Sequence, residues 1–181
     1  ATSFQSVSGA GNNGMDELLR NTKRFFNNKK SQNKVFDKNI TFNVIPKIGS
    51  FQPNGYTDEE MKFNNESRKI LNDKTILLTA TTVRVPVLRS HSISLNIEFN
   101  GNIEINRIKK EIGKFPGIDL VDDPKKNKFP TPIDSSNKDN CIIGRIRKDY
   151  SKNNCVSVWI VGDQIRKGAA LNAIQIAELL V

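Results

Sequence analysis

Apolar residues recur at helical spacing after the small, glycine-rich stretch 6–14. They are Met15, Leu18, Leu19, Phe25 and Phe26. Because residues three and four apart share a helical face, we expect a loop over residues 6–14 and a helix from Met15 to Phe26. Asp16 and Glu17 would then lie in the first turn, where carboxylates favour the helix dipole. The backbone N–H groups of the loop could bind an anion, or the loop could be only a flexible entry to the helix.

A second helix is marked by its first residues. Thr57 and Glu60 have the spacing of a capping box, which predicts a helix from there to about Leu71. Its apolar residues make a poor stripe, whereas charged residues recur at spacings of three and four and share one face. They are Glu59, Lys62, Glu66 and Lys69. This face is either a solvated, salt-bridged surface or a helix start that points a carboxylate and an ammonium into a site.

Several stretches are rich in β-branched residues or alternate apolar and polar positions, which is typical of strands. They are residues 40–45, 75–85, 93–99, 118–121, 142–146 and 156–161. A short helix is expected over 105–112, ending at Gly113, and the proline segment 129–132 is expected to be extended. Strands and helices are interspersed without strict alternation or repeats. The chain is therefore predicted to be α+β, with a mixed, largely antiparallel sheet covered by helices.

The connection after the second of these strands contains Pro86, which cannot donate a hydrogen bond to a central strand. The chain must bend, bulge or run along a sheet edge there. Arg84 and His91 are an odd number of residues apart and would point to opposite faces of a flat strand. Only a break near Pro86 allows both side chains to meet at one substrate.

The last stretch, from about Arg166 to Leu180, is apolar on nearly every side. Its alanines allow other elements to approach closely, so we expect this helix to be packed on most of its sides. All residues, 1–181, are predicted to form a single domain.

Composition limits the class of protein. A hydrophobic content of 36% is enough for a core, and no apolar run approaches the roughly 20 residues that cross a bilayer. The first residues have no basic segment followed by an apolar one, so no secretory signal is expected. Two cysteines and one histidine predict neither a disulfide framework nor a metal site. We expect a cytoplasmic protein, or one of the plastid stroma if a preceding segment carries a transit peptide.

The charge balance favours anionic partners. Lysine and arginine number 28 and aspartate and glutamate 19, which gives a net charge of +9. Nucleic acids, phosphate esters and carboxylates all fit this charge. Aromatic residues lie mostly in apolar patterns instead of alternating with basic ones, which disfavours nucleic-acid binding. The lysine- and asparagine-rich stretch 27–34 is interpreted as a loop.

Few residues are candidates for chemistry. Arg84 stands among valines, and a buried guanidinium needs either an internal carboxylate or a carboxylate or phosphate of a ligand. His91 is the only histidine, and it is either a hydrogen-bonded structural residue or a general acid or base. Cys141 and Cys155 have no neighbouring histidine or helix start to activate them, so both are taken as structural. No glycine-rich turn between a strand and a helix marks a dinucleotide site.

Five segments carry a resemblance to a known family. They are residues 3–11 (SFQSVSGAG), 44–49 (VIPKIG), 83–92 (VRVPVLRSHS), 129–132 (FPTP) and 162–172 (GDQIRKGAALN). In this order they resemble the C-terminal half of aspartate-semialdehyde dehydrogenases. The resemblance runs from end to end of the chain. It implies a fold like the C-terminal domain of glyceraldehyde-3-phosphate dehydrogenase, with residues 166–180 packed on the family's N-terminal domain.

The resemblance also implies a reaction, the NADPH-dependent reductive dephosphorylation of L-aspartyl 4-phosphate to L-aspartate 4-semialdehyde through a cysteine thioester. This reaction serves the biosynthesis of lysine, threonine and methionine. Arg84 would bind the substrate carboxylate, and His91 would be the acid and base. Glu59 and Lys62 would contact the substrate amino group and the phosphate, and Gln5 would contact the substrate or the thioester carbonyl.

For the cofactor, NADP, the resemblance implies contacts from Ser8, Gly9 and Gln164, with Asn172 as a further candidate. The family's nucleophilic cysteine and dinucleotide fingerprint belong to its N-terminal half, so we expect this chain alone to be inactive. A homodimer or homotetramer with a small-molecule substrate is expected, without nucleic acid or membrane as partner. The alternatives are a related acyl-phosphate reductase, such as N-acetylglutamyl-phosphate reductase, and a basic module that binds RNA or phosphate.

Overall fold

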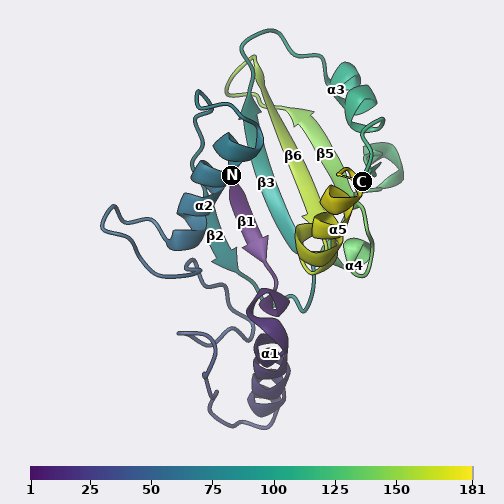
Figure 1. The fold of residues 1–181 in the computed structure, drawn as a ribbon. Helices are drawn as coiled ribbons and strands as arrows, with labels where there is room; N and C mark the ends of the chain where they lie inside the picture. Colours follow the sequence, from purple (N-terminus) through teal and green to yellow (C-terminus); the bar gives the residue numbers. More distant parts are fainter. Residues whose placement is uncertain (181) are drawn as a thin grey trace. The chain divides into compact units, whose positions relative to one another are not determined.

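A computed structural model describes residues 1–180 of the chain (Figure 1). The structure divides into two compact units, which we call unit 1, Ala1–Leu88, and unit 2, which begins at Arg89. Of the helices in residues 1–180, none has the length and apolar character needed for a membrane span.

Two short parallel strands carry several of the residues of interest in unit 1. β1 spans Thr2–Gln5 and β2 spans Thr81–Arg84, and their register places Gln5 opposite Arg84. The buried positions of both strands are polar, namely Ser3, Gln5, Thr82 and Arg84. The backbone of Arg84 also exchanges two hydrogen bonds with Ile45, of 2.8 and 3.0 Å. The strand pair therefore buries a polar face, which is unusual for a core and typical of a binding site.

The first helix begins earlier than predicted. After β1, a turn of 3₁₀ helix over Val7–Ala10 leads directly into α1, Gly11–Phe26. The chain changes direction at Gly11, whose φ of 73° lies in the left-handed region that favours glycine. Asp16 and Glu17 consequently lie in the second turn, and the interpretation of both as first-turn carboxylates is wrong.

Glu17 has a different structural role. It is fully buried, and its carboxylate accepts hydrogen bonds from the backbone N–H groups of Lys34, Val35 and Phe36, at 2.6, 2.7 and 3.3 Å. The loop predicted over residues 27–34 is confirmed, since it contains neither helix nor strand. Glu17 fixes the end of that loop against α1, where Phe36 packs on the small apolar core of unit 1.

The capping box and the helix that follows it are confirmed. α2 spans Asp58–Ile70, the hydroxyl of Thr57 accepts a hydrogen bond from the Glu60 N–H, and the Glu60 carboxylate accepts one from the Thr57 N–H. No residue of α2 is fully buried, in keeping with its poor apolar stripe. The cap therefore fixes where the helix starts, and with it the position of Glu59.

Two strand predictions in unit 1 need correction. The strand over 40–45 is wrong, because the chain turns at Phe42, whose φ is 54°, and Asn43 N–H donates to the Ile40 carbonyl at 3.1 Å. The strand over 75–85 is confirmed only in its last part, Thr81–Arg84. At its beginning, the Asp73 side chain holds Thr75 in a turn through two hydrogen bonds. β-branched composition alone did not distinguish these turns from strands.

Unit 2 contains a four-stranded sheet in the order β3, β6, β5, β4. These strands span His91–Glu98, Cys155–Gly162, Cys141–Lys148 and Ile118–Leu120, respectively. The first two neighbouring pairs are antiparallel and the last is parallel. The predicted mixed, largely antiparallel sheet is therefore confirmed. Its register places His91 opposite Gly162 at one end of β3.

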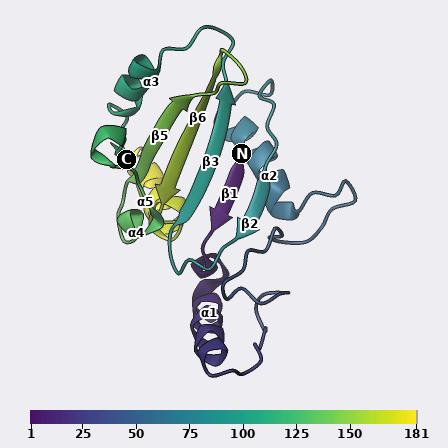
Figure 2. The same ribbon diagram turned by 180° about the vertical axis from the view of Figure 1, so that it is seen from behind.

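Three α-helices belong to the described part of unit 2. They are α3 (Ile105–Ile112), α4 (Pro132–Ser135) and α5 (Leu171–Glu178). The prediction of α3 and of its end at Gly113 is confirmed, and its isoleucines pack on the buried residues of β5 and β6. In Figure 1, α5 lies in front of β5 and β6, and in Figure 2 it lies behind them. This helix therefore covers one face of the unit 2 sheet.

The C-terminal stretch is helical but not enclosed. A π-helix over Arg166–Ala170 precedes α5. The side chains of Ile174, Ile176 and Leu179 are 57%, 54% and 86% exposed, so the prediction of packing on most sides is wrong within residues 1–180. Packing of this apolar surface on another domain stays a prediction.

Candidate functional site

A buried guanidinium is the central feature of unit 1. Arg84 is 7% exposed, and its Nη1 donates to the carbonyl oxygen of Ser6 at 2.7 Å. The ring of Phe36 lies beside it, with its centroid 5.9 Å from Cζ. No carboxylate of residues 1–88 lies within 4.0 Å of the guanidinium. Several of its N–H donors are therefore left for a ligand.

The electrostatic surroundings of Arg84 favour an anion. Burial lowers the pKa of the guanidinium, and the Glu59 carboxylate partly offsets this effect from beyond ion-pair distance. Arginine nevertheless remains protonated in proteins at neutral pH. A buried cation with so few partners is costly, and a bidentate carboxylate is the ligand that offsets this cost best.

Glu59 links the other predicted substrate-binding residues of unit 1. Its Oε1 accepts a hydrogen bond from Gln5 Nε2 at 3.1 Å, and its Oε2 pairs with Lys62 Nζ at 3.2 Å. The hydrogen bond that Lys62 donates to Glu59 and the charge of this carboxylate raise the pKa of Lys62, whose side chain is 59% exposed. The first turn of α2 thus presents an ammonium and a carboxylate side by side, an arrangement that agrees with both interpretations of this helix.

These four residues form a cluster with complementary chemistry. Arg84 can bind a carboxylate, Glu59 can bind an ammonium, and Lys62 can bind a phosphate. Gln5 is buried at the end of β1, and its side-chain amide donates a hydrogen bond to Glu59. The structure therefore brings together the four residues predicted to bind substrate, and their combined charges fit an amino acid that carries a second anionic group.

The predicted cofactor residues Ser8 and Gly9 lie in the 3₁₀ turn after β1. Ser8 N–H donates to the Leu88 carbonyl at 3.2 Å, and Gly9 N–H donates to the Ser6 carbonyl at 3.1 Å. Neither N–H is therefore left to bind an anion, and that interpretation of the loop is wrong for these two groups. Gly9 is exposed and has no side chain, so a ligand can approach its backbone closely.

In unit 2, the structure connects Gln164 with the residue that precedes His91. Gln164 Oε1 accepts a hydrogen bond from Ser90 N–H at 3.1 Å. His91 is half-buried at the start of β3, opposite Gly162. Asn172, the further cofactor candidate, is half-buried in the first turn of α5. The acid/base candidate and the main cofactor candidate of unit 2 are thus held at the same end of the sheet.

A buried carboxylate that was not predicted from the sequence lies beside these residues. Asp163 is 0% exposed and accepts hydrogen bonds from Arg89 Nε and from backbone N–H groups that follow it. Burial alone would raise the pKa of Asp163, but these hydrogen bonds and one from Asn137 N–H outweigh it and lower the pKa. The signal was present in the sequence, because an aspartate before a helix start commonly accepts from the N–H groups two and three residues on.

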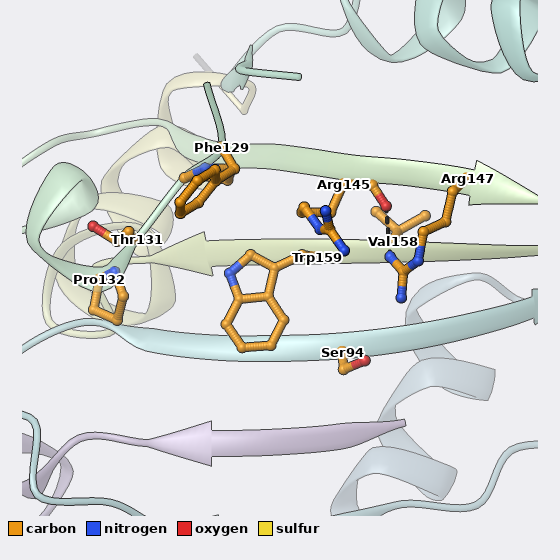
Figure 3. A pocket seen from close by; sticks show the side chains of 9 residues that line it. Ser94, Phe129, Thr131, Pro132, Arg145, Arg147, Val158 and Trp159 are labelled. Carbon is orange, nitrogen blue, oxygen red and sulfur yellow. Dashed lines mark hydrogen bonds between the residues drawn. The ribbon is translucent and has the colours of Figure 1, made fainter. Parts of the chain in front are cut away.

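A groove on the sheet of unit 2 was also missed (Figure 3). Trp159, Phe129 and prolines of the segment 129–132 line it, together with Arg145 and Arg147 from β5. Arg145 has a φ of 56° within a β-bulge, where its N–H donates to Asp122 at 2.9 Å. The alternation of β6 indicates that Trp159 faces away from its buried neighbours, but only the bulge directs Arg145 to the same groove.

The two cysteines are poor nucleophiles in this environment. Burial raises the pKa of Cys141, and Lys167 offsets the effect only in part. Burial, followed by the charge of Glu98, raises the pKa of Cys155. Both thiols therefore stay protonated at neutral pH, which agrees with a structural role. In the described residues, 1–180, no three potential metal ligands gather.

Comparisons with known proteins find related sequences and structures. The family model described as semialdehyde dehydrogenase, dimerisation domain, matches residues 1–167. An aspartate-semialdehyde dehydrogenase from Prochlorococcus marinus is 46% identical over 180 residues, which are 99% of this chain and 52% of that protein. The crystal structure of aspartate semialdehyde dehydrogenase II from Vibrio cholerae, complexed with ASA, has a TM-score of 0.95 at 42% identity and covers 99% of this chain and 53% of that one.

A more distant enzyme shares the fold. The crystal structure of aspartate semialdehyde dehydrogenase with NADP from Candida albicans has a TM-score of 0.68 at 20% identity, over 99% of this chain and 48% of that one. The resemblance stated from the sequence and the predicted fold class are confirmed. The chain spans about half the length of the curated relatives it matches.

Proposed function

The chain belongs to the semialdehyde dehydrogenase family, whose dimerisation domain it carries, and from that premise we propose that it binds substrate and supplies the acid and base in an aspartate-semialdehyde dehydrogenase. The proposed reaction is the NADPH-dependent reductive dephosphorylation of L-aspartyl 4-phosphate to L-aspartate 4-semialdehyde. The observation that carries the proposal is the cluster of Arg84, Glu59, Lys62 and Gln5 in unit 1. Its charges match the three charged groups of this substrate one by one.

The substrate has a carboxylate, an ammonium and a phosphate. Arg84 receives the carboxylate, because its guanidinium is buried and, among residues 1–88, donates a side-chain hydrogen bond only to Ser6. Glu59 receives the ammonium and Lys62 the phosphate. A free ammonium distinguishes this substrate from N-acetylglutamyl phosphate, whose neutral amide would offer the partly buried Glu59 carboxylate no cation besides Lys62. This difference favours aspartyl phosphate over that alternative.

His91 acts as the acid and base. A histidine can take the proton of a thiol, so that the thiolate attacks the acyl phosphate, forms a thioester and displaces inorganic phosphate. It can return the proton when the thiolate leaves after hydride transfer. Burial raises the pKa of Cys141 and Cys155, which disfavours both as the nucleophile, so the proposal places the attacking thiolate on another cysteine. This chain alone is therefore expected to be inactive.

The proposed cofactor is NADP, whose reduced form, NADPH, would supply the hydride when bound. Gly9 offers an exposed backbone without a side chain, and Ser8 precedes it in the same turn. Gln164 Oε1 accepts a hydrogen bond from Ser90 N–H, which fixes the orientation of its amide. The NADP complex of the Candida albicans enzyme agrees with this cofactor.

A fused enzyme tests the proposal. The amino-terminal half of the Prochlorococcus marinus relative is joined to Ala1, and reduction of aspartyl phosphate is followed by NADPH consumption. His91→Asn is expected to lower kcat about a hundredfold or more with little change in KM, because proton transfer contributes at least that much.

Arg84→Lys is expected to raise KM for the substrate about tenfold, because a bidentate contact becomes a point charge. Asp149→Asn, in the loop between β5 and β6 of unit 2, is the control. Full activity of His91→Asn would contradict the acid/base role.

We also propose that the chain forms a homodimer through the groove around Trp159. The matching family model describes a dimerisation domain, and the groove combines apolar rings with arginines, a composition typical of interfaces. Trp159→Glu is expected to convert the dimer to a monomer in light scattering, whereas Tyr150→Glu, at a fully exposed position, should not. A Trp159→Glu variant that stays dimeric would contradict this interface.

A further inference from the structure

The end of the unit 2 sheet that carries His91 and Gln164 is held by one buried carboxylate. Asp163 Oδ2 accepts hydrogen bonds from Arg89 Nε at 2.7 Å and from Asn137 N–H at 2.8 Å. Its Oδ1 accepts from the N–H groups of Ile165 and Arg166, at 3.0 and 3.3 Å. The carboxylate thereby ties together three separate segments of the chain.

Two of these segments carry the residues proposed for catalysis. Arg89 lies two residues before His91, and Gln164 directly follows Asp163. Gln164 Oε1 in turn accepts from Ser90 N–H at 3.1 Å, and Ser90 is 1% exposed. Two hydrogen bonds therefore hold the segment before His91, one from Arg89 to Asp163 and one from Ser90 to Gln164.

The backbone at Ser90 shows why this attachment matters. Ser90 has a φ of 73°, a left-handed conformation that non-glycine residues rarely adopt. Such a conformation persists only where the surroundings hold it, and it is common next to functional residues. The hydrogen bond between Ser90 Oγ and Ser136 Oγ, at 3.0 Å, adds to this support. The direction in which β3 begins, and with it the position of His91, depends on this strained residue.

We propose that Asp163 is a positioning residue, which holds the backbone before His91 and the side chain of Gln164 in fixed geometry through Arg89 and Ser90. It touches neither substrate nor cofactor, and its effect on catalysis passes through His91. The relevance for catalysis rests on the function proposed above for His91, whereas the attachment itself does not. Because hydrogen bonds lower the pKa of Asp163, the carboxylate stays charged at neutral pH and its pair with Arg89 persists.

The first test uses the chain as it is and measures amide hydrogen exchange by NMR. Both Arg89→Gln and Asp163→Asn remove the charged hydrogen bond between Arg89 and Asp163, which holds the segment before His91. In both variants, exchange of the Ser90 amide is therefore expected to be about tenfold faster or more. The amides in the middle of β3 and β6 should keep their protection. His91 is the only histidine, so its ring proton signals are assigned without ambiguity, and they should broaden or double in both variants.

Asp139→Asn is the matched control. Asp139 pairs with Arg166 at the surface and is 54% exposed, so its removal changes a nearby charge without changing the attachment of Ser90. Arg89→Gln keeps the proposal testable if Asp163→Asn does not fold, since the Arg89 side chain is 30% exposed. Unchanged Ser90 exchange in the folded variants would overturn the proposal. Equal acceleration throughout β3 would also overturn it, because it would indicate loss of stability alone.

A second test asks whether the attachment matters for the reaction. In the fused enzyme described above, Arg89→Gln is expected to lower kcat about tenfold while KM for aspartyl phosphate stays within about twofold. A loss of stability alone would lower the amount of active enzyme but would leave the line shape of the His91 signals unchanged. An unchanged kcat would overturn the positioning role. Activity in His91→Asn would instead refute the proposed function, while the Ser90 exchange would still decide on the attachment.

Discussion

Arg84 in unit 1 and Asp163 in unit 2 are both buried, and their charges are satisfied to different degrees. Arg84 in unit 1 donates one side-chain hydrogen bond, to the Ser6 carbonyl, and no carboxylate of residues 1–88 pairs with it. Asp163 in unit 2 accepts hydrogen bonds from Arg89, Asn137, Ile165 and Arg166. Arg84 thus leaves most of its donors unused, whereas Asp163, like the buried Glu17 of unit 1, is saturated with hydrogen bonds.

This difference distinguishes a buried charge that can bind a ligand from one that stabilises the fold. A saturated buried charge stabilises the segments that surround it and has little left to offer a ligand. A buried charge with unused donors costs stability until a ligand of opposite charge arrives. Burial and charge alone therefore do not identify a binding residue, whereas the count of satisfied hydrogen bonds does.

Removal of the saturated charge should have the largest effect on stability. Asp163→Ala leaves Arg89 and the three N–H groups without their acceptor, and the free energy of unfolding is expected to fall by about 3–5 kcal/mol. Urea unfolding measures the change. Asp139→Ala, which removes the exposed partner of Arg166, should cost less than about 1 kcal/mol. A similar loss in both variants would contradict the comparison.

The stability of the protein at acidic pH should depend on the carboxylate of Asp163. The pKa of Asp163 is lowered in the folded protein, so its contribution to stability is present above the unfolded pKa of about 3.9 and is lost as the pH falls through the folded pKa. The free energy of unfolding should therefore fall below about pH 4, and it should fall less steeply in Asp163→Asn. The test measures the free energy of unfolding of the wild type and of Asp163→Asn at several pH values between neutral and acidic. Parallel dependences on pH would contradict the prediction.

Loss of the helix cap should have an intermediate effect. Thr57→Ala removes the acceptor for Glu60 N–H and is expected to cost about 1 kcal/mol of stability. Thr57→Ser should restore most of this loss, because its hydroxyl can accept the same bond. Thermal unfolding compares the three proteins. Failure of the serine variant to recover would indicate that the buried methyl group, and not the cap, is responsible.

Removal of the unsatisfied charge should have the smallest effect on stability. Arg84→Met is expected to change the free energy of unfolding by less than about 1 kcal/mol, because an apolar side chain replaces a charge without an ionic partner. Arg89→Met should cost more, since it leaves Asp163 without its cation. Urea unfolding compares the two variants directly. If the order were reversed, Arg84 would have a structural role in place of the proposed binding role.

The sequence determined the elements whose local signals are strong. The Thr57–Glu60 cap fixed the start of α2, and alternating or β-branched runs located β3, β5 and β6. Arg84 could be recognised as unusual because arginine is rare among valines in a strand. Local patterns failed at residues 40–45, where a positive φ at Phe42 turns a β-branched stretch away from a strand.

Tertiary structure decided which of these residues act together. Gln5, Glu59 and Lys62 are joined by hydrogen bonds between a strand and a helix more than 50 positions apart, and no local pattern encodes that contact. Asp163 reaches Arg89 across 74 positions for the same reason. Periodicity reports which face of an element is apolar, whereas the degree to which a buried charge is satisfied depends on donors and acceptors that only the folded chain brings within 3 Å of it.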